Sequence, residues 1–380
     1  HYLDRLPMRP KLLKRLKEVA NYEKIGTPFK RNNTWYVYKN NGLQNQSVLY
    51  KMDKLGGTLY EVLDPNKLST DGTVALKGIS FSHNGRYLAY VIARNGSDWQ
   101  EIYVKDLTTG KDLADHIEWA KFGNAAWCGD GFYYSAYDAP SNHAFTSKNE
   151  VHKIYYHHLG TAQKEDRLFY QNPAYPLRFY AVTVNKEETI MYLTESGEGS
   201  GNNLYVRDLR NKDSQFIQMT NDMNCQYEPV ETIGKDIYIF TNRLILANLA
   251  KPGIKDWKEL VPESQNVLND VTFTHGKMVL NYSKDASSHC YLYSLDGRNE
   301  GEIKLPSLGN ASFSGDRNDV ECFYAFSSFT TPGTVYQFDT NTKTSRIYSQ
   351  PKATFKQNQF VTKQVFYTSK DGTRVPMFLT

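Results

Sequence analysis

Residues 86–107, RYLAYVIARNGSDWQEIYVKDL, contain two β-strand patterns in succession. The first, RYLAYVIA, follows the turn residues SHNG and is rich in aromatic and β-branched side chains, which favour strands. The second, EIYVKDL, alternates apolar and polar residues and reaches Asp106 before a further turn. The stretch therefore predicts two short antiparallel strands that follow each other along the chain.

The same pair of patterns occurs seven times. The short alternating strand ends in Asp, Asn or His, and repeats are 40 to 53 residues apart, at Asp53, Asp106, His158, Asp208, Asn248, Asp296 and Asp339. An aromatic-rich strand precedes each of them, in TWYVYKN, RYLAYVIA, GFYYSAYD, TIMYLTES, DIYIFTN, KMVLNYSKD and ECFYAFSSF. A third strand follows most pairs, for example GTLYEVLD and DRLFYQ.

Short antiparallel strands that recur in groups of three or four at this spacing are typical of β-propeller blades. A blade is apolar on both faces and buries them by stacking against two neighbours around a closed ring. We therefore predict an all-β fold in which residues 26–357 form a seven-bladed β-propeller. A pair of β-sandwiches is the alternative, but no linker rich in Pro, Gly or Ser interrupts the repeats.

The composition argues against several classes of partner. The 380 residues carry 45 Lys and Arg against 41 Asp and Glu, and this net charge of +4 is too small and dispersed for nucleic acid. No apolar stretch approaches the roughly 20 residues of a membrane-spanning helix, so no membrane partner is expected. Four cysteines lack C-x-x-C spacing and are expected to be free thiols, at Cys128, Cys225, Cys290 and Cys322.

One helix is predicted, over residues 10–22, PKLLKRLKEVANY. Leu12, Leu13 and Leu16 fall on one face, and Pro10 stands at the start, where its missing N–H costs nothing. The basic opposite face is compatible with anionic lipid. We expect instead that the apolar face docks on the protein itself.

The two ends of the sequence carry further expectations. The first residue is His1 rather than Met, which indicates a processed or truncated start. Residues 365–380, VFYTSKDGTRVPMFLT, place Asp371-Gly372 between two apolar runs and predict a β-hairpin. Because the sequence stops within the second strand, we expect the hairpin to join a sheet that this chain lacks.

Several long segments resemble the prolyl oligopeptidase family, in the same order along the chain. They are NYEKIGTPFKRNNTWYVYKNNGLQNQSVLYKMD (21–53), LDPNKLSTDGTVALKGISFSHNGRYLAYVIARNGSDW (63–99), SFTTPGTVYQFD (328–339) and VFYTSKDGTRVPMF (365–378). The resemblance implies a seven-bladed propeller that caps an α/β-hydrolase domain with a Ser-His-Asp triad. By this resemblance residues 1–25 are a helical arm of the hydrolase domain, 26–357 the propeller, and 358–380 the first strands of a truncated hydrolase domain.

The function implied by the resemblance is that of a serine endopeptidase that hydrolyses short peptides after proline. The propeller would gate access, since threading a folded protein would require unfolding it at a cost of about 5–15 kcal/mol. The partners would be short proline-containing peptides and the hydrolase domain of the same protein, in a monomer without cofactor or metal. The alternatives are a relative that cleaves after basic residues or from the amino end, and a stand-alone propeller that acts as a protein- or peptide-binding scaffold.

The resemblance also implies substrate-binding positions on the propeller rim. Phe122 in EWAKFGNAAW matches an aromatic residue that contacts substrate in the family, the alternative being that it packs between blades. Arg178 in YPLRFYAV, or Phe179 if the register shifts by one, matches a second position that is often apolar in the family. Three further charged residues match rim positions more loosely, Lys77, Asp98 and Glu198, and the first and second of these could pair.

No catalytic residue is assigned within this chain. A serine nucleophile of this class needs G-x-S-x-G on a strand-to-helix turn. The nearest string, GEGSG at 197–201, has a different spacing, so we expect Ser200 to be a loop residue. We expect the 380-residue chain alone to be inactive, and either a cytoplasmic or a bacterial periplasmic location fits the sequence.

Overall fold

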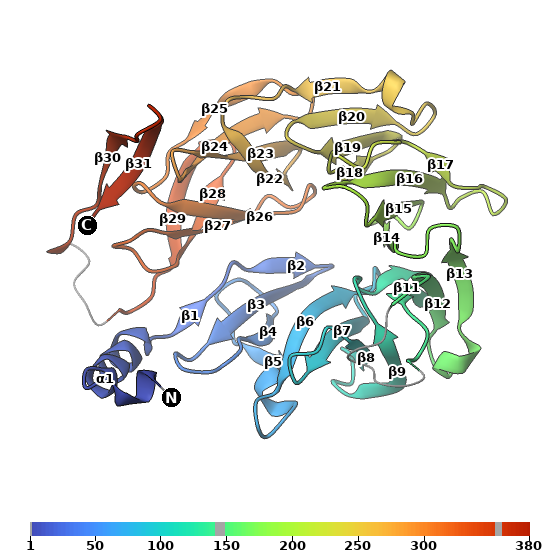
Figure 1. Cartoon of the computed structure of the whole chain (residues 1–380), viewed down its shortest axis with the longest axis horizontal. Helices are drawn as coiled ribbons and strands as arrows, with labels where there is room; N and C mark the ends of the chain where they lie inside the picture. Colours follow the sequence, from blue (N-terminus) through green and yellow to red (C-terminus); the bar gives the residue numbers. More distant parts are fainter. Residues whose placement is uncertain (1, 141–148, 354–358) are drawn as a thin grey trace. The chain divides into compact units, whose positions relative to one another are not determined.

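The computed structural model describes residues 2–140, 149–353 and 359–380, and most of their regular structure is β-strand. The chain divides into two compact units. The first unit consists of His1–Asp64 and Glu263–Thr380, and the second unit of Pro65–Pro262. Figure 1 labels the strands of both units in chain order.

The second unit contains three antiparallel sheets. An eight-stranded sheet comprises β6 (Val74–Phe81), β7 (Tyr87–Arg94), β8 (Gln100–Asp106), β9 (Asp112–Ala120), β10 (Ala126–Cys128), β11 (Gly131–Ala136), β12 (Lys153–His158) and β13 (Arg167–Gln171). Two four-stranded sheets follow, β14 (Phe179–Val184), β15 (Ile190–Ser196), β16 (Asn202–Asp208) and β17 (Ile217–Gln218), then β18 (Glu228–Ile233), β19 (Asp236–Phe240), β20 (Leu244–Asn248) and β21 (Lys258–Val261). Short 3-10 helices lie beside the sheets, η2 (Pro65–Lys67), η3 (Gln163–Glu165) and η4 (Ile254–Asp256).

The first unit begins with η1 (Leu3–Arg5) and α1 (Arg9–Ala20). Its five-stranded sheet comprises β1 (Lys24–Ile25), β2 (Phe29–Arg31), β3 (Thr34–Asn40), β4 (Val48–Met52) and β5 (Tyr60–Leu63). Two four-stranded sheets are β22 (Val267–Thr274), β23 (Lys277–Lys284), β24 (Ser287–Ser294) and β25 (Asn299–Ile303), then β26 (Asn310–Ser314), β27 (Cys322–Ser327), β28 (Thr334–Asp339) and β29 (Thr344–Ser349). A separate hairpin joins β30 (Lys363–Thr368) to β31 (Arg374–Leu379), as the Asp-Gly signal predicts.

All seven predicted strand pairs are present as antiparallel neighbours, namely β3/β4, β7/β8, β11/β12, β15/β16, β19/β20, β23/β24 and β27/β28. The recurring acidic or amide residue at the end of the second strand has a local function. The Asp106 carboxylate accepts hydrogen bonds from the backbone N–H groups of Thr108 and Thr109, and the Asp339 carboxylate accepts two in the same way. These side chains stabilise the turn that ends each strand, which explains why this residue type recurs.

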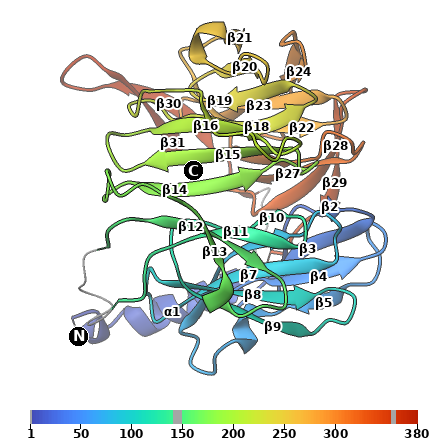
Figure 2. The same cartoon turned by 90° about the vertical axis from the view of Figure 1, so that its right-hand side faces the viewer.

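Within the second unit, successive sheets pack face to face (Figure 2). Tyr133 and Ile154 of the eight-stranded sheet pack against Tyr180 and Met191 of the next sheet. The opposite face of that sheet packs on β18–β21 through a second apolar cluster that includes Tyr192 and Ile239. The sheet of β14–β17 is thus apolar on both faces, as the propeller prediction requires of a blade.

In the first unit, strands from the two ends of the sequence pack together. Trp35 of β3 and Phe323 of β27 are both buried, and their ring centroids are 6.0 Å apart in an edge-to-face arrangement. Lys30 Nζ lies 3.1 Å from the Asp319 carboxylate beside them. Replacing a fully buried phenylalanine such as Phe323 by alanine typically costs about 3–5 kcal/mol, so this contact is a substantial part of the unit's stability.

The sheets do not divide as the sequence predicts. The sequence predicts seven blades, but only five sheets of the described residues have the size of one blade. The reason is that β6–β13 form one continuous sheet. The two halves of that sheet are joined by one residue pair, Ala120 of β9 with Ala136 of β11. The repeat predicts the strand pairs correctly, but it does not show which neighbouring pairs share hydrogen bonds.

The helix prediction is correct in place but not in packing. α1 spans Arg9–Ala20, yet Leu12, Leu13 and Leu16 are 54, 43 and 61% exposed. The expected docking of this face is therefore wrong for the residues that the structure describes, since none of them covers it. In the same described ranges, no helix combines the length and hydropathy that crossing a membrane requires.

Candidate functional site

Phe122, the first predicted site residue, lies in the turn between β9 and β10 of the second unit. Half of its surface is exposed, and its backbone φ is +58°, a left-handed conformation that is uncommon outside glycine. The preceding residue holds this turn, because the Lys121 N–H donates to the Ser135 carbonyl over 3.0 Å. The turn therefore leaves half of the aromatic ring at the surface.

His152 connects this turn to β14. The Tyr180 N–H donates to His152 Nδ1 over 2.9 Å, so the proton of the neutral ring is on Nε2, which donates to the Lys121 carbonyl over 3.1 Å. His152 is fully buried, and burial lowers its pKa to about 4. A neutral histidine thus fixes the Phe122 turn against β14.

Phe179, the first residue of β14, completes an aromatic pair. The Phe122 and Phe179 ring centroids are 5.1 Å apart with the planes tilted by 35°. Phe179 is the residue that the sequence predicts if the register shifts by one, and it is the one that contacts Phe122. We call Phe122 and Phe179 the rim pair.

Arg178 has a different environment. Its guanidinium donates to Glu195 over 3.0 Å and to Glu198 over 2.6 Å, and it lies 3.6 Å from the Tyr175 ring centroid. The side chain is only 14% exposed. Hydrogen bonds to Glu198 and Glu195 raise the pKa of Arg178 against the effect of burial. Arg178 therefore links Glu195 of β15 to Glu198 of the loop that follows it.

Glu195 is the buried centre of this network. Its carboxylate accepts hydrogen bonds from Arg178, Tyr180, Asn203 and Tyr205 at 2.9 to 3.2 Å. Burial alone would raise the pKa of Glu195, but the bonds from Asn203, Arg178 and Tyr205 lower it, so the group is ionised. Neither Glu195 nor His152 is predicted from the sequence, because their roles depend on residues from other strands.

The glycine loop, residues 197–201, approaches neighbouring backbone too closely for other residue types. Gly197 has φ +122°, and a Cβ there would lie 3.0 Å from the Leu177 carbonyl oxygen. A Cβ on Gly201 would collide with the Cys225 carbonyl. Ser200 donates its hydroxyl to the Asn224 carbonyl over 3.1 Å, and in the described part of the chain no histidine is hydrogen-bonded to it. The loop is thus a structural element, consistent with the prediction for Ser200.

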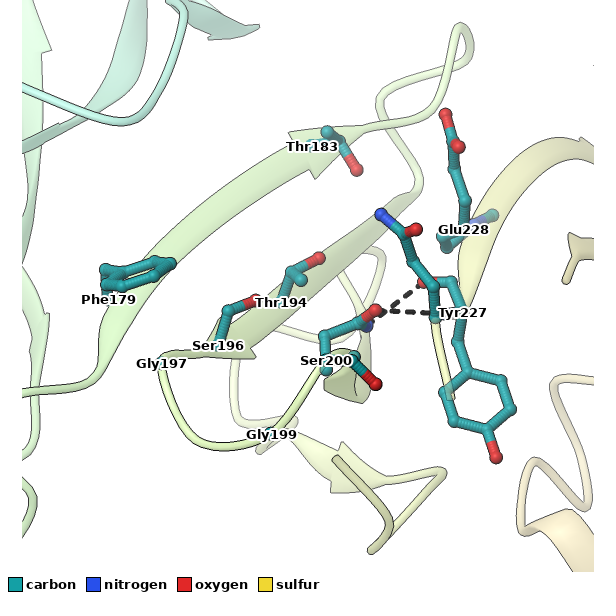
Figure 3. A pocket seen from close by; sticks show the side chains of 13 residues that line it. Phe179, Thr183, Thr194, Ser196, Gly197, Gly199, Ser200, Tyr227 and Glu228 are labelled. Atoms are coloured by element: carbon teal, nitrogen blue, oxygen red, sulfur yellow. Dashed lines mark hydrogen bonds between the residues drawn. The ribbon is translucent and has the colours of Figure 1, made fainter. Parts of the chain in front are cut away.

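A pocket of about 570 Å³ adjoins Phe179 and the glycine loop. It lies between the sheets of β14–β17 and β18–β21, and Figure 3 shows side chains from both sheets around it. Its lining comprises Phe179, Thr183, Thr194, Ser196, Gly197, Gly199, Ser200, Gly201, Asn202, Gln226, Tyr227, Glu228 and Pro229. Asn202 holds the two sheets together, since its amide exchanges hydrogen bonds of 2.9 and 3.1 Å with the Tyr227 backbone. We call this the rim pocket, and its volume is in the range of ordinary ligand sites.

The remaining predicted rim residues do not form the suggested pair. The Asp98 carboxylate lies 3.9 Å from Lys121 Nζ, and Lys77 is exposed. Lys121 Nζ also lies over the rings of Trp99 and Phe122, at 4.9 and 5.2 Å from the centroids. The charge of Asp98 is therefore beside the Phe122 turn.

Comparison with known proteins identifies the family. The domain described as "Prolyl oligopeptidase, N-terminal beta-propeller domain" matches residues 1–351. The chain belongs to this family. Its sheets are accordingly those of an all-β propeller, and the resemblance seen in the sequence is confirmed.

Relatives of the propeller family cover the whole chain. The chain is 37% identical to a prolyl endopeptidase of Elizabethkingia meningoseptica and 31% identical to prolyl oligopeptidase A of Galerina marginata. It spans about half the length of these curated relatives, 55 and 57% respectively.

Solved structures agree with this assignment. A prolyl endopeptidase structure matches 99% of the chain with a TM-score of 0.84 and 32% identity, over 56% of its own length. Prolyl oligopeptidase B of Galerina marginata, bound to a 35-residue hydrolysis and macrocyclization substrate, matches with a TM-score of 0.90 and 28% identity, over 58% of its length.

Proposed function

We propose that this chain acts as the propeller portion of a prolyl endopeptidase that hydrolyses short peptides after proline. The rim pair and the rim pocket would contact the peptide. The Ser, His and Asp residues of the reaction would lie in the part of the relatives that this chain does not match. In such a reaction serine attacks the carbonyl, histidine transfers the proton, aspartate orients the histidine, and an oxyanion hole stabilises the developing charge.

The proposal includes seven blades, with the eight-stranded sheet counted as two. In strand register, β6–β9 and β10–β13 share only the Ala120–Ala136 pair. Trp127 of β10 stacks on Tyr87 of β7, with ring centroids 6.1 Å apart, and donates its indole N–H to the Ser80 carbonyl of β6. Face-to-face packing of this kind is what neighbouring blades do, so it supports two blades rather than one.

The role of the propeller in this proposal is exclusion. A narrow passage admits a short flexible peptide, whereas a folded protein would first have to unfold, at a cost of about 5–15 kcal/mol. The chain would thus restrict the substrates by size, and the hydrolase part would determine the cleaved bond.

The rim pair is the observation that carries the proposal. Phe122 is 50% exposed in a left-handed turn, and a buried histidine and a backbone hydrogen bond hold it there. An exposed aromatic ring held in an unfavourable backbone conformation indicates a function outside folding. The rim pocket beside Phe179 provides the space that a bound peptide needs.

Peptide binding by the purified 380-residue chain tests the proposal. A fluorescent octapeptide with a central proline should bind without being hydrolysed, and the same sequence in a loop of a folded protein should not bind. Phe122→Asn should weaken binding about fivefold or more, because it removes the ring and keeps a residue that tolerates positive φ. Hydrolysis of the peptide by the chain alone would contradict the proposal. Tighter binding of the folded protein that carries the sequence in a loop than of the free octapeptide would also contradict it and would favour the scaffold alternative.

A further inference from the structure

We infer that the rim pocket binds a positively charged side chain, lysine or arginine, of the peptide. The inference rests on the proposed function, because it concerns which peptides the same site prefers. It is specific to this chain's own residues around the pocket and does not depend on the hydrolytic reaction.

The lining of the rim pocket combines one carboxylate with hydroxyl and amide groups that can accept hydrogen bonds. Glu228, the first residue of β18, is the one charged residue among those that line it. Its carboxylate is exposed and has no hydrogen-bond or ion-pair partner within residues 149–353. Thr183 and Thr194 add hydroxyl groups that are likewise free of side-chain hydrogen bonds in that range, so ammonium and guanidinium groups match the lining well.

The surroundings do not neutralise this carboxylate. Arg178, the cation beside the glycine loop, is already shared by Glu195 and Glu198. The lining carries no positively charged residue, so the Glu228 carboxylate gives this concave site a negative potential that attracts a cation.

Phe179 and Glu228 suit the two parts of a long basic side chain. The two residues belong to different sheets and both line the pocket, as Figure 3 shows. Lysine and arginine carry an apolar stem that packs on aromatic rings and a charged head that needs acceptors. A neutral apolar side chain would use the ring alone and would leave the Glu228 carboxylate without a partner.

The test compares three labelled peptides that share a central proline and differ at one position three residues before it, with lysine, norleucine or glutamate there. Fluorescence anisotropy gives their dissociation constants with the 380-residue chain at about 50 mM salt. We expect the lysine peptide to bind about three- to fivefold more tightly than the norleucine peptide, because one partly exposed ion pair contributes up to about 1 kcal/mol. The glutamate peptide should bind most weakly, and 0.5 M salt should reduce these differences.

Two variants locate the effect. Glu228→Gln should bind the lysine and norleucine peptides equally, whereas Glu118→Gln, a change at an exposed acid of β9 outside the pocket, should keep the preference. Unchanged circular dichroism and melting temperature would show that both variants fold. Equal binding of the three peptides by the wild type, or a preference that survives in Glu228→Gln, would overturn the inference alone. If none of the peptides binds, the proposed function fails as well.

Discussion

The imidazole of His157 lies 2.7 Å from the carboxylate of Asp166, and both side chains are fully buried in the second unit. The other ring nitrogen faces Asp115 at 3.0 Å, so both nitrogens donate and the ring is an imidazolium. Burial alone would lower the pKa of His157, but the hydrogen bonds with Asp166 and Asp115 raise it. The charged ring connects β12 to β9 and to the segment before β13.

Replacing His157 should therefore destabilise the chain strongly. His157→Gln leaves two buried carboxylates without a cation, a change that typically costs about 3–5 kcal/mol. Because the folded pKa is raised above the unfolded value of about 6.5, the contribution of His157 is complete below pH 6.5 and decreases as pH rises through the folded pKa. Denaturant unfolding of both proteins from pH 5.5 to 9 measures this, and a constant difference across that range would contradict it.

His152 should have the opposite pH dependence. Its folded pKa of about 4 is below the unfolded value, so the unfolded chain binds the extra proton between pH 6.5 and 4. The free energy of unfolding should decrease as pH is lowered through that window. The total loss should reach about 3 kcal/mol once pH is below both pKa values. His152→Leu should remove this component from unfolding curves, whereas the same change at exposed His158 should retain it. Parallel pH profiles for wild type and His152→Leu would exclude the assignment.

Phe122→Asn should separate stability from binding. The ring is half exposed and asparagine tolerates the left-handed backbone, so we expect a melting temperature within a few degrees of the wild type. Phe329→Ala, at a 70% exposed phenylalanine of the first unit, is the matched control and should leave peptide binding unchanged. A large loss of stability in Phe122→Asn would instead indicate that the ring has a packing role.

Arg178 and Glu198 should differ in their effect on stability. Arg178→Met leaves the Glu195 carboxylate buried with one donor fewer, which we expect to cost about 2–3 kcal/mol. Glu198→Gln removes an exposed partner and should change the free energy of unfolding little. Chemical denaturation measures both, and equal effects of the two variants would show that Glu195 does not depend on Arg178.

Gly201→Ala should disturb the rim pocket. The new Cβ would collide with the Cys225 carbonyl, which accepts a hydrogen bond from the Asn202 backbone N–H. Backbone atoms cannot move aside as a flexible side chain can, so the loop must shift. We expect lower thermal stability and weaker peptide binding together, with Gly253→Ala as the control, since a Cβ at Gly253 meets no neighbour.

Local patterns in the sequence are sufficient for the strands and their hairpins. The alternation in segments such as EIYVKDL depends on the period of a strand, and Asp106 or Asp339 stabilises the next turn within three residues. The helix of residues 9–20 and the terminal Asp-Gly hairpin are local in the same way. Phe122 could be selected only by resemblance to a family, through the segment EWAKFGNAAW.

Contacts between distant residues are what the sequence does not show. The number of separate sheets depends on one pair, Ala120 with Ala136, and the environment of Arg178 depends on Glu195 and Glu198. A difference of one residue decides which side chain meets Phe122: Phe179, the first residue of β14, contacts it, whereas Arg178, just before the strand, reaches Glu195 and Glu198.

The sequence by itself therefore determined the strands, their pairing into hairpins and the family. Only the tertiary structure decided which hairpins share a sheet, which charges are buried together, and where the rim pocket lies. The physical reason is range: turns and strand periods are set within a few residues, whereas burial and electrostatics depend on residues brought together from separate strands.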